Sequence, residues 1–521
     1  MSARPITLPG LIEILADTVP DRVAVETIDA TYTFAQIDER ATRLANHLIS
    51  LGIQPGDHVA VHSHNRIEWI DAFYGVMKAR AVPININFKY LKSELEYLYT
   101  NSESVAAIVA PEYTAAAKEA ASSGIRHWIE LGADYDTALA AASTQRPGGY
   151  EEDDLYVIYT GGTTGYPKGV MWRQVDVMRA AMNAGRFGAP LDSLEQLAEE
   201  AAANPSGTVY LAGGPMMHGG SQWILGNAHV SGQKVAFYTE KGFAPDKFLD
   251  LAEKAKVVSL TFLGDAMGRP VAEAILAEPD RWDLSSLMAI SNGAAPLTEG
   301  VREEIRRALP GRFIVDSYGS SEAGATSTRM EDGSGTVPGF PAGPDVEVFD
   351  ADWRPAPVGM DGLLGRSGAI PLGYFNDPVK TAATFKVIDS KRWSIPGDFA
   401  RREEDGTISL LGRGSVCINT GGEKVYPEEV EAMLLQHPEV FDAAVVGTPH
   451  ERWGQQVTAL VHRREGSTLD EAQLQSWAKE QISNYKVPKR ILFVDEVPRT
   501  PVSKVDYAAT ATAALTLLSQ D

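Results

Sequence analysis

The stretch YTGGTTGYPKGV, Tyr159–Val170, gathers the residue types that bind phosphate. Its glycines let backbone N–H groups turn toward an anion, its threonine hydroxyls add hydrogen-bond donors, and its lysine adds positive charge. The residues concerned are Thr160, Gly161, Gly162, Thr163, Thr164, Gly165 and Lys168. The sequence therefore predicts a loop that binds a polyphosphate, rather than a plain glycine turn.

This loop differs from the phosphate loop of the common NTPases. That template, GxxxxGK[ST], requires glycine before the lysine and serine or threonine after it. Here Pro167 precedes Lys168 and Gly169 follows it. We therefore expect nucleotide chemistry of another kind.

The elements that must position the loop can be read from apolar runs of strand length. One run, Leu155–Tyr159, leads directly into the loop. Similar runs alternate with helical patterns, which indicates α/β layers with parallel sheets. These runs are His58–Ser63, Val105–Ala110, Val257–Leu263 and Phe313–Tyr318. From about Pro341, short strands and turn residues predict a smaller β-rich unit, and after Gly412–Ser415 a compact tail predicts a separate α+β domain.

Composition limits the class of protein. A chain of 521 residues exceeds what one hydrophobic core usually supports, so we expect at least two domains. The net charge of −22 would repel nucleic acids and anionic lipid surfaces. Cys417 is the only cysteine, which excludes a disulfide framework and fits a cytoplasmic location. No apolar run is long enough to span a membrane, and the N-terminal segment predicts a helix, Leu11–Thr18, that docks on the main domain.

The loop resembles the signature phosphate loop of the adenylate-forming superfamily, which includes acyl-CoA synthetases, luciferase-like enzymes and adenylation domains of peptide synthetases. Six further segments resemble the other motifs of that family, in its order and over essentially the whole chain. They are Ser291–Leu297, Asp316–Gly324, Gly365–Phe385, Ser394–Ala400, Gly412–Glu431 and Pro498–Lys504. The chain departs from the family's usual residues at Gly161, Ser321, Pro396, Ser415 and Ser503.

The resemblance implies an α/β fold in two parts. Residues 1–413 would form a large N-terminal domain of layered α/β subdomains plus a small distorted β-barrel, with the ATP and acyl sites. Residues 414–521 would form a small, mobile α+β domain that carries the adenylation lysine.

The resemblance also implies residues for a first step, in which a carboxylate oxygen attacks the α-phosphorus of ATP. Glu322 and Thr164 would hold Mg²⁺, and Asp398 and Arg413 would bind the ribose hydroxyls. Lys504 would reach the carboxylate and the α-phosphate as the catalytic lysine. Further nucleotide contacts would come from the phosphate loop and from Gly293, Ala294, Ala295, Ser317, Tyr318, Gly319, Ser320 and Ser321.

In this family the small domain then rotates and presents another face, which binds CoA. The hinge corresponds to Ser415, and Gly421 and Gly422 would line the channel for the pantetheine arm. Candidates for contacts with the CoA phosphates are Lys424, Lys486, Lys489 and Arg490. His218 falls beside the acyl site and the thiol channel, where we expect it to shape and gate them; a plain buried histidine is the alternative.

The acid itself is the least specified part. The segment Ser259–Pro270 supplies mainly apolar groups, and no charged residue can be assigned to the far end of the acyl pocket, so an apolar acid is implied. The motifs are similar to those of the actinobacterial branch that activates fatty and steroid side-chain carboxylates.

We therefore expect an AMP-forming acid–CoA ligase that uses ATP, Mg²⁺ and CoA on a fatty or steroid side-chain acid and releases pyrophosphate. The alternatives are an acyl-AMP ligase, or another adenylate-forming enzyme that uses an aryl acid and a different acceptor. A nucleotide-binding regulatory protein without catalysis is a third. The partners of the expected ligase would be small molecules. The sequence does not give the oligomeric state, although such enzymes commonly form homodimers.

Overall fold

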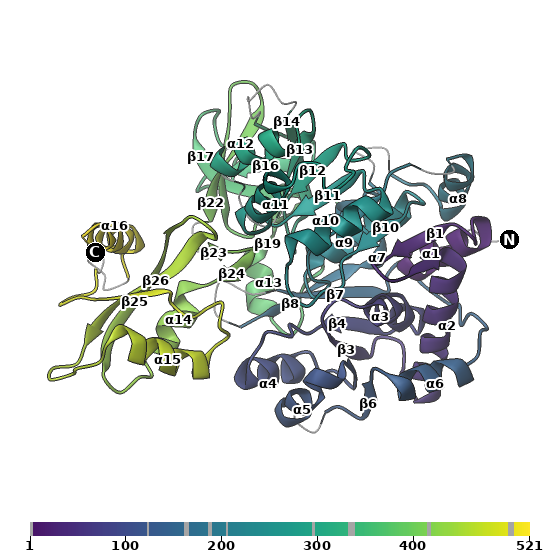
Figure 1. The fold of residues 1–521 in the computed structure, drawn as a ribbon, viewed down its shortest axis with the longest axis horizontal. Helices are drawn as coiled ribbons and strands as arrows, with labels where there is room; N and C mark the ends of the chain where they lie inside the picture. The colour runs from purple at the N-terminus through teal and green to yellow at the C-terminus, as the bar shows by residue number, and fades with distance from the viewer. Residues whose placement is uncertain are drawn as a thin grey trace.

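The computed structural model describes residues 4–121, 124–160, 166–185, 190–204, 207–293, 297, 299–331, 339–413, 418–498 and 505–520. These residues form five β-sheets with helices packed on them. Four sheets belong to a large unit, and the fifth belongs to a smaller C-terminal unit at the left of Figure 1. The predicted mixed α/β fold with a large N-terminal and a small C-terminal part is confirmed.

The largest sheet has the strand order β14-β13-β12-β11-β9-β10-β1-β2. Its six inner strands run parallel, and the edge strands β14 and β2 run antiparallel to their neighbours. The strands are β1 (Val23–Glu26), β2 (Thr31–Thr33), β9 (Tyr210–Ala212), β10 (Val235–Phe237), β11 (Ser259–Phe262), β12 (Ala289–Asn292), β13 (Phe313–Ser320) and β14 (Gly324–Glu331). The helices between them are α7 (Gln174–Ala181), α8 (Leu194–Ala203), α9 (Gly219–Val230), α10 (Pro245–Ala255), α11 (Asp265–Ala277) and α12 (Glu299–Ala308).

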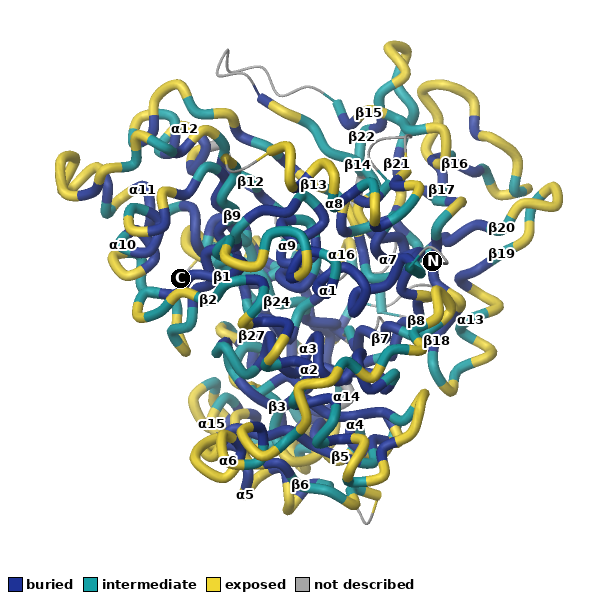
Figure 2. The backbone as a smooth tube through the Cα atoms, turned by 90° about the vertical axis from the view of Figure 1, so that its right-hand side faces the viewer, coloured by how far each residue is buried: buried dark blue, intermediate teal, exposed yellow. Residues whose placement is uncertain are grey.

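A second parallel sheet, in the order β4-β3-β5-β6, lies in the N-terminal part of the chain. All residues of its first three strands are buried, as expected for a sheet covered by helices. Figure 2 shows this interior in dark blue, with exposed turns around it. The strands are β3 (His58–His62), β4 (Val82–Asn85), β5 (Ala106–Val109) and β6 (His127–Glu130), and the helices are α2 (Phe34–Ser50), α3 (Ile67–Lys78), α4 (Lys92–Asn101), α5 (Pro111–Ala120) and α6 (Ala133–Ala141).

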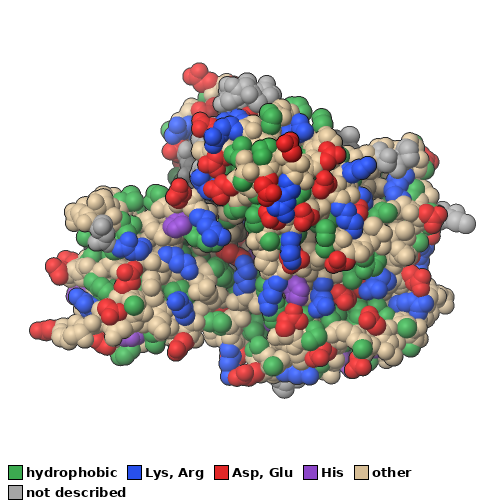
Figure 3. Space-filling model, in the orientation of Figure 1, with side chains coloured by type: hydrophobic (Ala, Val, Ile, Leu, Met, Phe, Trp, Pro, Cys, Tyr) green, Lys and Arg blue, Asp and Glu red, His purple; other side chains and the backbone are tan. Residues whose placement is uncertain are grey.

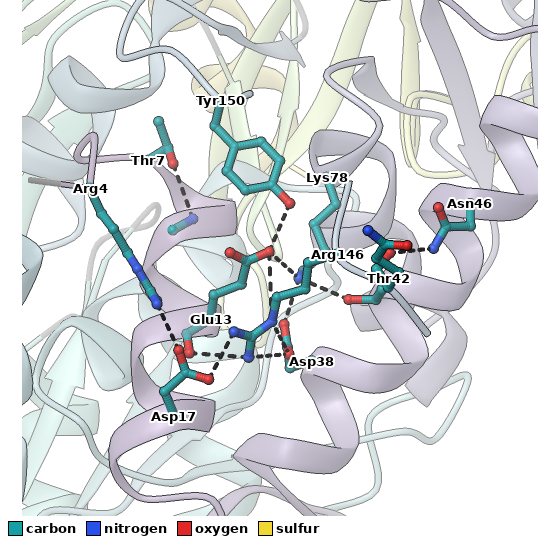
Figure 4. Close-up of polar contacts among 12 residues, drawn as sticks. Arg4, Thr7, Glu13, Asp17, Asp38, Thr42, Asn46, Lys78, Arg146 and Tyr150 are labelled. Atoms are coloured by element: carbon teal, nitrogen blue, oxygen red, sulfur yellow. Dashed lines mark hydrogen bonds and ion pairs between the residues drawn. The ribbon is translucent and has the colours of Figure 1, made fainter. Parts of the chain in front are cut away.

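The N-terminal helix α1 (Leu8–Thr18) docks on α2 and α3, as the sequence predicted. A buried ion cluster joins the three helices (Figure 4). The Lys78 ammonium donates to Glu13 at 2.8 Å, to Asp38 at 2.5 Å and to the Thr42 hydroxyl at 3.0 Å, and Arg146 adds a second cation on Asp38. Because Lys78 is fully buried, losing one of its carboxylates would leave a charge poorly compensated.

A short antiparallel sheet, β18-β8-β7, carries the predicted phosphate loop. Its strands are β7 (Leu155–Thr160), β8 (Lys168–Arg173) and β18 (Gly373–Tyr374). The loop therefore connects two hydrogen-bonded strands, with Thr160 opposite Lys168 where the connection begins.

The expected small β-barrel is instead an open sheet, so that detail of the prediction was wrong. The strands run in the order β15-β22-β21-β17-β20-β19, with β16 on β17, and no pairing in the described residues joins β15 to β19. The short edge strand β15 lies against β14 of the largest sheet. There the Ser327 hydroxyl donates to the Pro341 carbonyl at 2.8 Å. The edge of β15 that is not paired with β22 therefore faces the largest sheet. The strands are β15 (Phe340–Pro341), β16 (Val346–Phe349), β17 (Asp361–Arg366), β19 (Phe385–Ile388), β20 (Lys391–Ser394), β21 (Asp398–Arg402) and β22 (Thr407–Arg413), with α13 (Pro378–Thr384).

The C-terminal unit has a hydrophobic core of its own, formed by its sheet with α14 and α15. The sheet order is β24-β23-β26-β25, with β27 parallel to β26. The elements are β23 (Ile418–Thr420), β24 (Glu423–Val425), β25 (Val440–His450), β26 (Gly454–Arg463), β27 (Arg490–Phe493), α14 (Pro427–Leu434), α15 (Glu471–Gln481) and α16 (Tyr507–Leu518). The predicted boundary after Arg413 and the hinge at Ser415 fall at residues 414–417, outside the described residues, and stay predictions.

Figure 3 shows acidic and basic side chains mixed over the face in view. Within the described parts of the chain, every helix is too short or too polar to cross a lipid bilayer.

Candidate active site

A cavity of about 1210 Å³ opens where the carboxyl ends of parallel strands in the largest sheet meet the C-terminal unit. Ligands of α/β proteins commonly bind at this edge of a sheet. Strand ends supply Thr261, the segment Ser291–Gly293 and the segment Ser317–Ser321. The C-terminal unit supplies Gly422, Glu423, Lys424, Tyr426, Glu429, Tyr485 and Lys486.

The predicted phosphate loop begins at this cavity. Thr160 lines it, and Lys168 stands at the other end of the connection. The Lys168 ammonium contacts an Asp377 carboxylate oxygen at 2.6 Å, and the same carboxylate caps α13 through the Lys380 N–H. Burial raises the pKa of Asp377, but these hydrogen bonds outweigh it, so its pKa lies below the ordinary value. Lys168 is therefore positioned by the Asp377 carboxylate.

The strand ends beside the nucleotide motif rest on a buried ion network. Asp316 accepts from Arg302 at 2.6 Å, from Arg329 at 3.0 Å and from Asn292 at 3.2 Å. Asn292 in turn accepts from the Gly264 N–H at 2.9 Å. The network connects β12, β13, β14, α12 and the start of α11, and it fixes the strands that carry Gly293 and Ser317–Ser321.

The turn that connects β13 to β14 requires glycine for a steric reason. A side chain on Gly319 would collide with the Gly324 carbonyl and the Ala325 backbone on the neighbouring strand. Gly324 itself has φ of +68°, in the left-handed region that favours glycine. The GSSEAG segment therefore forms a tight β13–β14 connection that holds Glu322 in place.

Glu322 is held by hydrogen bonds from separate segments. The Tyr374 hydroxyl donates to its carboxylate at 2.9 Å, and the Ser394 hydroxyl donates to its backbone carbonyl at 2.6 Å. The Trp172 indole N–H donates to the neighbouring Ser321 carbonyl at 3.0 Å. The sequence motifs predicted Glu322 itself but not these three supporting side chains.

The predicted ribose pair is brought together. Asp398 and Arg413 are direct register partners on the antiparallel strands β21 and β22. Asp398 is buried. The side chain of Arg413 is not described, so the structure pairs these two residues through their backbones.

Several predicted residues lie outside the described part of the chain. They are Gly161, Gly162, Thr163, Thr164, Gly165, Ala294, Ala295, Ser415 and Lys504. Their roles stay predictions.

The glycine loop of the C-terminal unit lies at the cavity. Gly421 and Gly422, between β23 and β24, have φ of +59° and +85°. A Cβ on Gly421 would lie 2.7 Å from the Trp453 ring, and one on Gly422 would lie 3.3 Å from Leu263 of the large unit. Both positions therefore require glycine, and the second brings the loop backbone close to the large unit.

His218 and Glu423 meet at this junction. His218 precedes α9, and its Nε2 lies 3.5 Å from a Glu423 carboxylate oxygen that belongs to the C-terminal unit. Lys89 pairs with the other Glu423 oxygen. Burial raises the pKa of Glu423, but the charges and hydrogen bonds of His218 and Lys89 hold it well below its usual range. The His218 side chain is 39% exposed, so the alternative of a plain buried histidine was wrong.

A second ion cluster, which we term the docking cluster, joins α4 to the C-terminal unit. It consists of Glu94, Lys486, Glu429 and Ser483. The Lys486 ammonium contacts Glu94 at 2.5 Å and Glu429 at 2.6 Å, and the Ser483 hydroxyl donates to Glu94. The Lys486 side chain is only 4% exposed, and its ammonium is paired with these two carboxylates in this arrangement.

Of the other three residues predicted to contact the CoA phosphates, one lines the cavity and two are bound to neighbouring groups of the C-terminal unit. Lys424 lines the cavity. The Lys489 ammonium donates to the Asn484 carbonyl at 3.3 Å, and Arg490 lies 3.5 Å from Glu471. The cavity is also lined by Arg179 and Asn227, which no sequence motif marks.

Comparison with known proteins gives the family. Residues 12–375 match the model of the AMP-binding enzyme family, and residues 429–504 match that of the AMP-binding enzyme C-terminal domain. The 3-oxocholest-4-en-26-oate–CoA ligase of Rhodococcus rhodochrous is 41% identical over 530 residues, which cover 96% of this chain and 95% of that protein. The medium/long-chain-fatty-acid–CoA/3-oxocholest-4-en-26-oate–CoA ligase of Mycobacterium tuberculosis H37Rv is 42% identical over 527 residues, with the same coverage.

Solved structures show the same fold. The amide bond synthetase McbA from Marinactinospora thermotolerans superimposes with a TM-score of 0.81 at 24% identity, covering 97% of this chain and 99% of that one. ATP-bound MatB from Rhodopseudomonas palustris superimposes with a TM-score of 0.67 at 27% identity, covering 97% and 98%. With two family models that together match most of its length, the chain belongs to the AMP-binding enzyme family, among relatives named as CoA ligases.

Proposed function

We propose that this protein is an AMP-forming acid–CoA ligase for a medium- or long-chain fatty acid or a steroid side-chain acid. The observation that carries the proposal is similarity to CoA ligases over 96% of the chain at 41% and 42% identity. ATP and CoA are the substrates that such AMP-binding ligases use. The reaction joins acid and ATP to give an acyl-adenylate and pyrophosphate, and the CoA thiol then displaces AMP.

In the first step, cations meet the charge that develops on the phosphate oxygens. Thr160 and Lys168 lie at the two ends of the phosphate loop, which supports their contact with the β- and γ-phosphates. Lys168 would exchange Asp377 for phosphate when ATP binds. Asp398 and Arg413, which are register partners, would hold the ribose hydroxyls, and Lys504 would reach the reacting carboxylate.

The residues present fit a magnesium ion brought in with ATP. Mg²⁺ prefers hard oxygen ligands and usually binds one or two carboxylates together with substrate phosphates. Glu322 offers such a carboxylate, fixed by the Tyr374 hydroxyl, and Thr164 is its predicted companion. The ion would neutralise phosphate charge.

In the second step the C-terminal unit would face the cavity as it does here. The pantetheine arm of CoA would run along the glycine loop Gly421–Gly422, since the backbone of this loop approaches the large unit closely. His218, tied to Glu423 across the junction, would shape and gate the path between acid and thiol. Lys424 is the best-placed of the predicted contacts for a CoA phosphate, because Lys486 is engaged in the docking cluster.

A panel of acids tests the proposal. Purified protein, ATP and Mg²⁺ are incubated with fatty, steroid side-chain and aryl acids, with and without CoA. A fatty or steroid acid should give thioester and AMP in equal amounts, only when CoA is present. Acid-dependent pyrophosphate exchange without any thioester would favour the acyl-AMP ligase, and no exchange with any acid would favour a regulatory protein. The cytoplasmic location and the homodimer stay predictions.

A further inference from the structure

Helix α4 presents one side to the strands that carry the phosphate loop. Tyr97 and Asn101 are four residues apart and therefore share a side of the helix. The Asn101 side-chain oxygen accepts from the Tyr159 hydroxyl at 2.9 Å, at the end of β7 where the loop begins. The Tyr97 ring stacks on the Tyr166 ring two residues before β8, with 4.3 Å between ring centroids and 25° between ring planes. The two residues of α4 thus contact both ends of the loop.

The start of the loop has further support, whereas the end relies more on α4. The Tyr159 N–H donates to the Asn85 side chain at 2.7 Å, and the Tyr159 carbonyl accepts from it at 2.8 Å. The Tyr159 ring also lies over Gly169, where a Cβ would be 2.7 Å from the ring. Tyr166, by contrast, is 50% exposed, and the Tyr97 ring covers it. The position of Tyr166 therefore depends strongly on this stack.

Pro167 connects the stacked ring to Lys168. A proline fixes its own φ and restricts the backbone of the residue before it, so Tyr166–Lys168 is a short, stiff segment. The Lys168 ammonium pairs with Asp377 at 2.6 Å. Burial and the negative charge of Asp377 raise the pKa of the Tyr97 hydroxyl, as expected when the stack and the ion pair are neighbours. The place of the Tyr166 ring is therefore passed on to Lys168.

The turn that carries Asp377 is also attached to α4. Glu103, two residues after the end of this helix, accepts from the Asn376 side-chain amide at 2.9 Å. Helix α4 therefore supports Lys168 in two ways, through the Tyr166 ring before it in the chain and through the turn that supplies its carboxylate partner.

We propose that Tyr97 is a positioning residue for binding of the ATP phosphates, because its ring holds Tyr166 and, through Pro167, keeps Lys168 in place. Tyr97 is not one of the residues that line the cavity, so it acts through Lys168 and does not touch the nucleotide. The role belongs to the ring, since the contact is between ring faces. The inference rests on one part of the proposed function, the contact of Lys168 with the β- and γ-phosphates.

Binding of ATP and of AMP tests the inference, because AMP lacks the phosphates assigned to Lys168. Equilibrium dialysis with Mg²⁺ gives the Kd of each nucleotide and needs no acid. Tyr97→Leu should weaken ATP binding by about two- to tenfold, the range expected for a stacked aromatic pair, and should leave AMP binding unchanged. Tyr97→Phe, which keeps the ring, should bind both nucleotides as the wild-type protein does.

A double-mutant cycle locates the effect. Tyr166→Leu should weaken ATP binding by a similar factor, and Tyr97→Leu should add little to it, because the stack is already lost. Tyr97→Leu should likewise add little to Lys168→Ala, since the lysine that it positions is then absent. Glu96→Gln is the control, because Glu96 is exposed on the same helix and should change neither Kd.

The outcomes separate this inference from the proposed function. Equal loss of ATP and AMP binding in Tyr97→Leu would make Tyr97 a structural residue and overturn the inference. Unchanged ATP binding in Tyr97→Leu, or a full additional loss on top of Tyr166→Leu, would also overturn it. The expected Kd pattern without thioester from any acid of the panel would overturn the proposed ligase activity alone. No ATP binding by the wild-type protein would overturn both.

Discussion

Several charged side chains at the site already have partners before a substrate binds. Lys168 contacts Asp377, and Glu423 contacts both His218 and Lys89. Such pairs hold the side chains in defined positions, so binding requires an exchange of partners rather than the ordering of a free chain. Under the proposed function, phosphate would replace the Asp377 carboxylate as the partner of Lys168.

Lys504 gives the sharpest test among single residues. Lys504→Ala should slow adenylation by roughly 10² to 10³-fold, as expected for one contact to charge in the transition state. Thiolysis of preformed acyl-adenylate should continue, because in the proposed mechanism the lysine would act only in the first step. Rapid-quench measurement of each half-reaction checks this. Lys247→Ala, which removes an exposed ion pair, is the control, and equal slowing of both half-reactions would refute the assigned role.

The predicted contact between Asp398 and the ribose of ATP can be tested directly. Asp398→Ala should raise the KM for ATP by about 10 to 100-fold, the loss expected for hydrogen bonds to a charged acceptor. The variant should no longer distinguish ATP from an analogue without ribose hydroxyls, whereas the wild-type protein should. Asp361→Ala, at an exposed ion pair on β17, is the control. Continued discrimination by Asp398→Ala would show that Asp398 does not contact the ribose.

At the scale of elements, the position of the C-terminal unit depends on α4. Glu94 on this helix meets Lys486 and Ser483 of the C-terminal unit, and the pair is almost completely buried. Removing one partner from a buried ion pair is strongly destabilising, because the remaining charge stays buried. The docking cluster should therefore favour the arrangement in which the glycine loop lies at the cavity.

Glu94→Gln should thus slow thioester formation about tenfold or more while acid-dependent pyrophosphate exchange keeps its rate. The substitution keeps the shape of the side chain and removes its charge. Glu119→Gln is a matched control, since Glu119 forms an exposed ion pair with Lys92 of the same helix and should change either rate by less than about twofold. Equal loss in both half-reactions would mean that the cluster does not select one arrangement.

A buried histidine ties α9 to the neighbouring elements and predicts a pH effect. His229 accepts from the Tyr74 hydroxyl at 2.6 Å and donates to the Ala24 carbonyl at 3.2 Å, so both ring nitrogens are used by the neutral form. Burial lowers its pKa from 6.5 to about 4. The His229 imidazole therefore becomes protonated below pH 6.5 in the unfolded chain, but only below about pH 4 in the folded chain.

The contribution of His229 to stability is complete above pH 6.5 and is lost as pH falls toward 4. In this window it should lower the free energy of unfolding by up to about 1.4 kcal/mol per pH unit. Urea denaturation as a function of pH measures the slope. His229→Gln should make it shallower, whereas His127→Gln, at a partly buried site, should not. An unchanged slope in His229→Gln would exclude His229 as the cause.

The sequence predicted the elements well where local pattern decides them and less well where packing does. The parallel strands, helix α1 and the Asp398–Arg413 pair follow from apolar runs and motifs. The prediction of a barrel was wrong because a barrel closes only when its two edge strands, here β15 and β19, pair with each other. Instead, β15 lies against β14 of the largest sheet. The docking cluster was missed because its residues become neighbours only when separate units pack together.

At the scale of the whole molecule, the chain places one cavity between two units with separate cores. The large unit supplies the strand ends and the register partners Asp398 and Arg413, and the C-terminal unit supplies the glycine loop and, in its undescribed part, Lys504. A division of this kind lets two half-reactions use one cavity in turn. An intermediate must then persist between them, and the proposed function names it as an acyl-adenylate.

The fate of a labelled carboxylate oxygen decides whether that intermediate forms. The acid is labelled in both carboxylate oxygens with oxygen-18 and converted to its thioester with ATP and CoA, and AMP is examined by mass spectrometry. Attack of the carboxylate on the α-phosphorus predicts one oxygen-18 atom in AMP for each thioester formed. Unlabelled AMP, or label in free phosphate together with ADP, would contradict an acyl-adenylate and with it the proposed reaction.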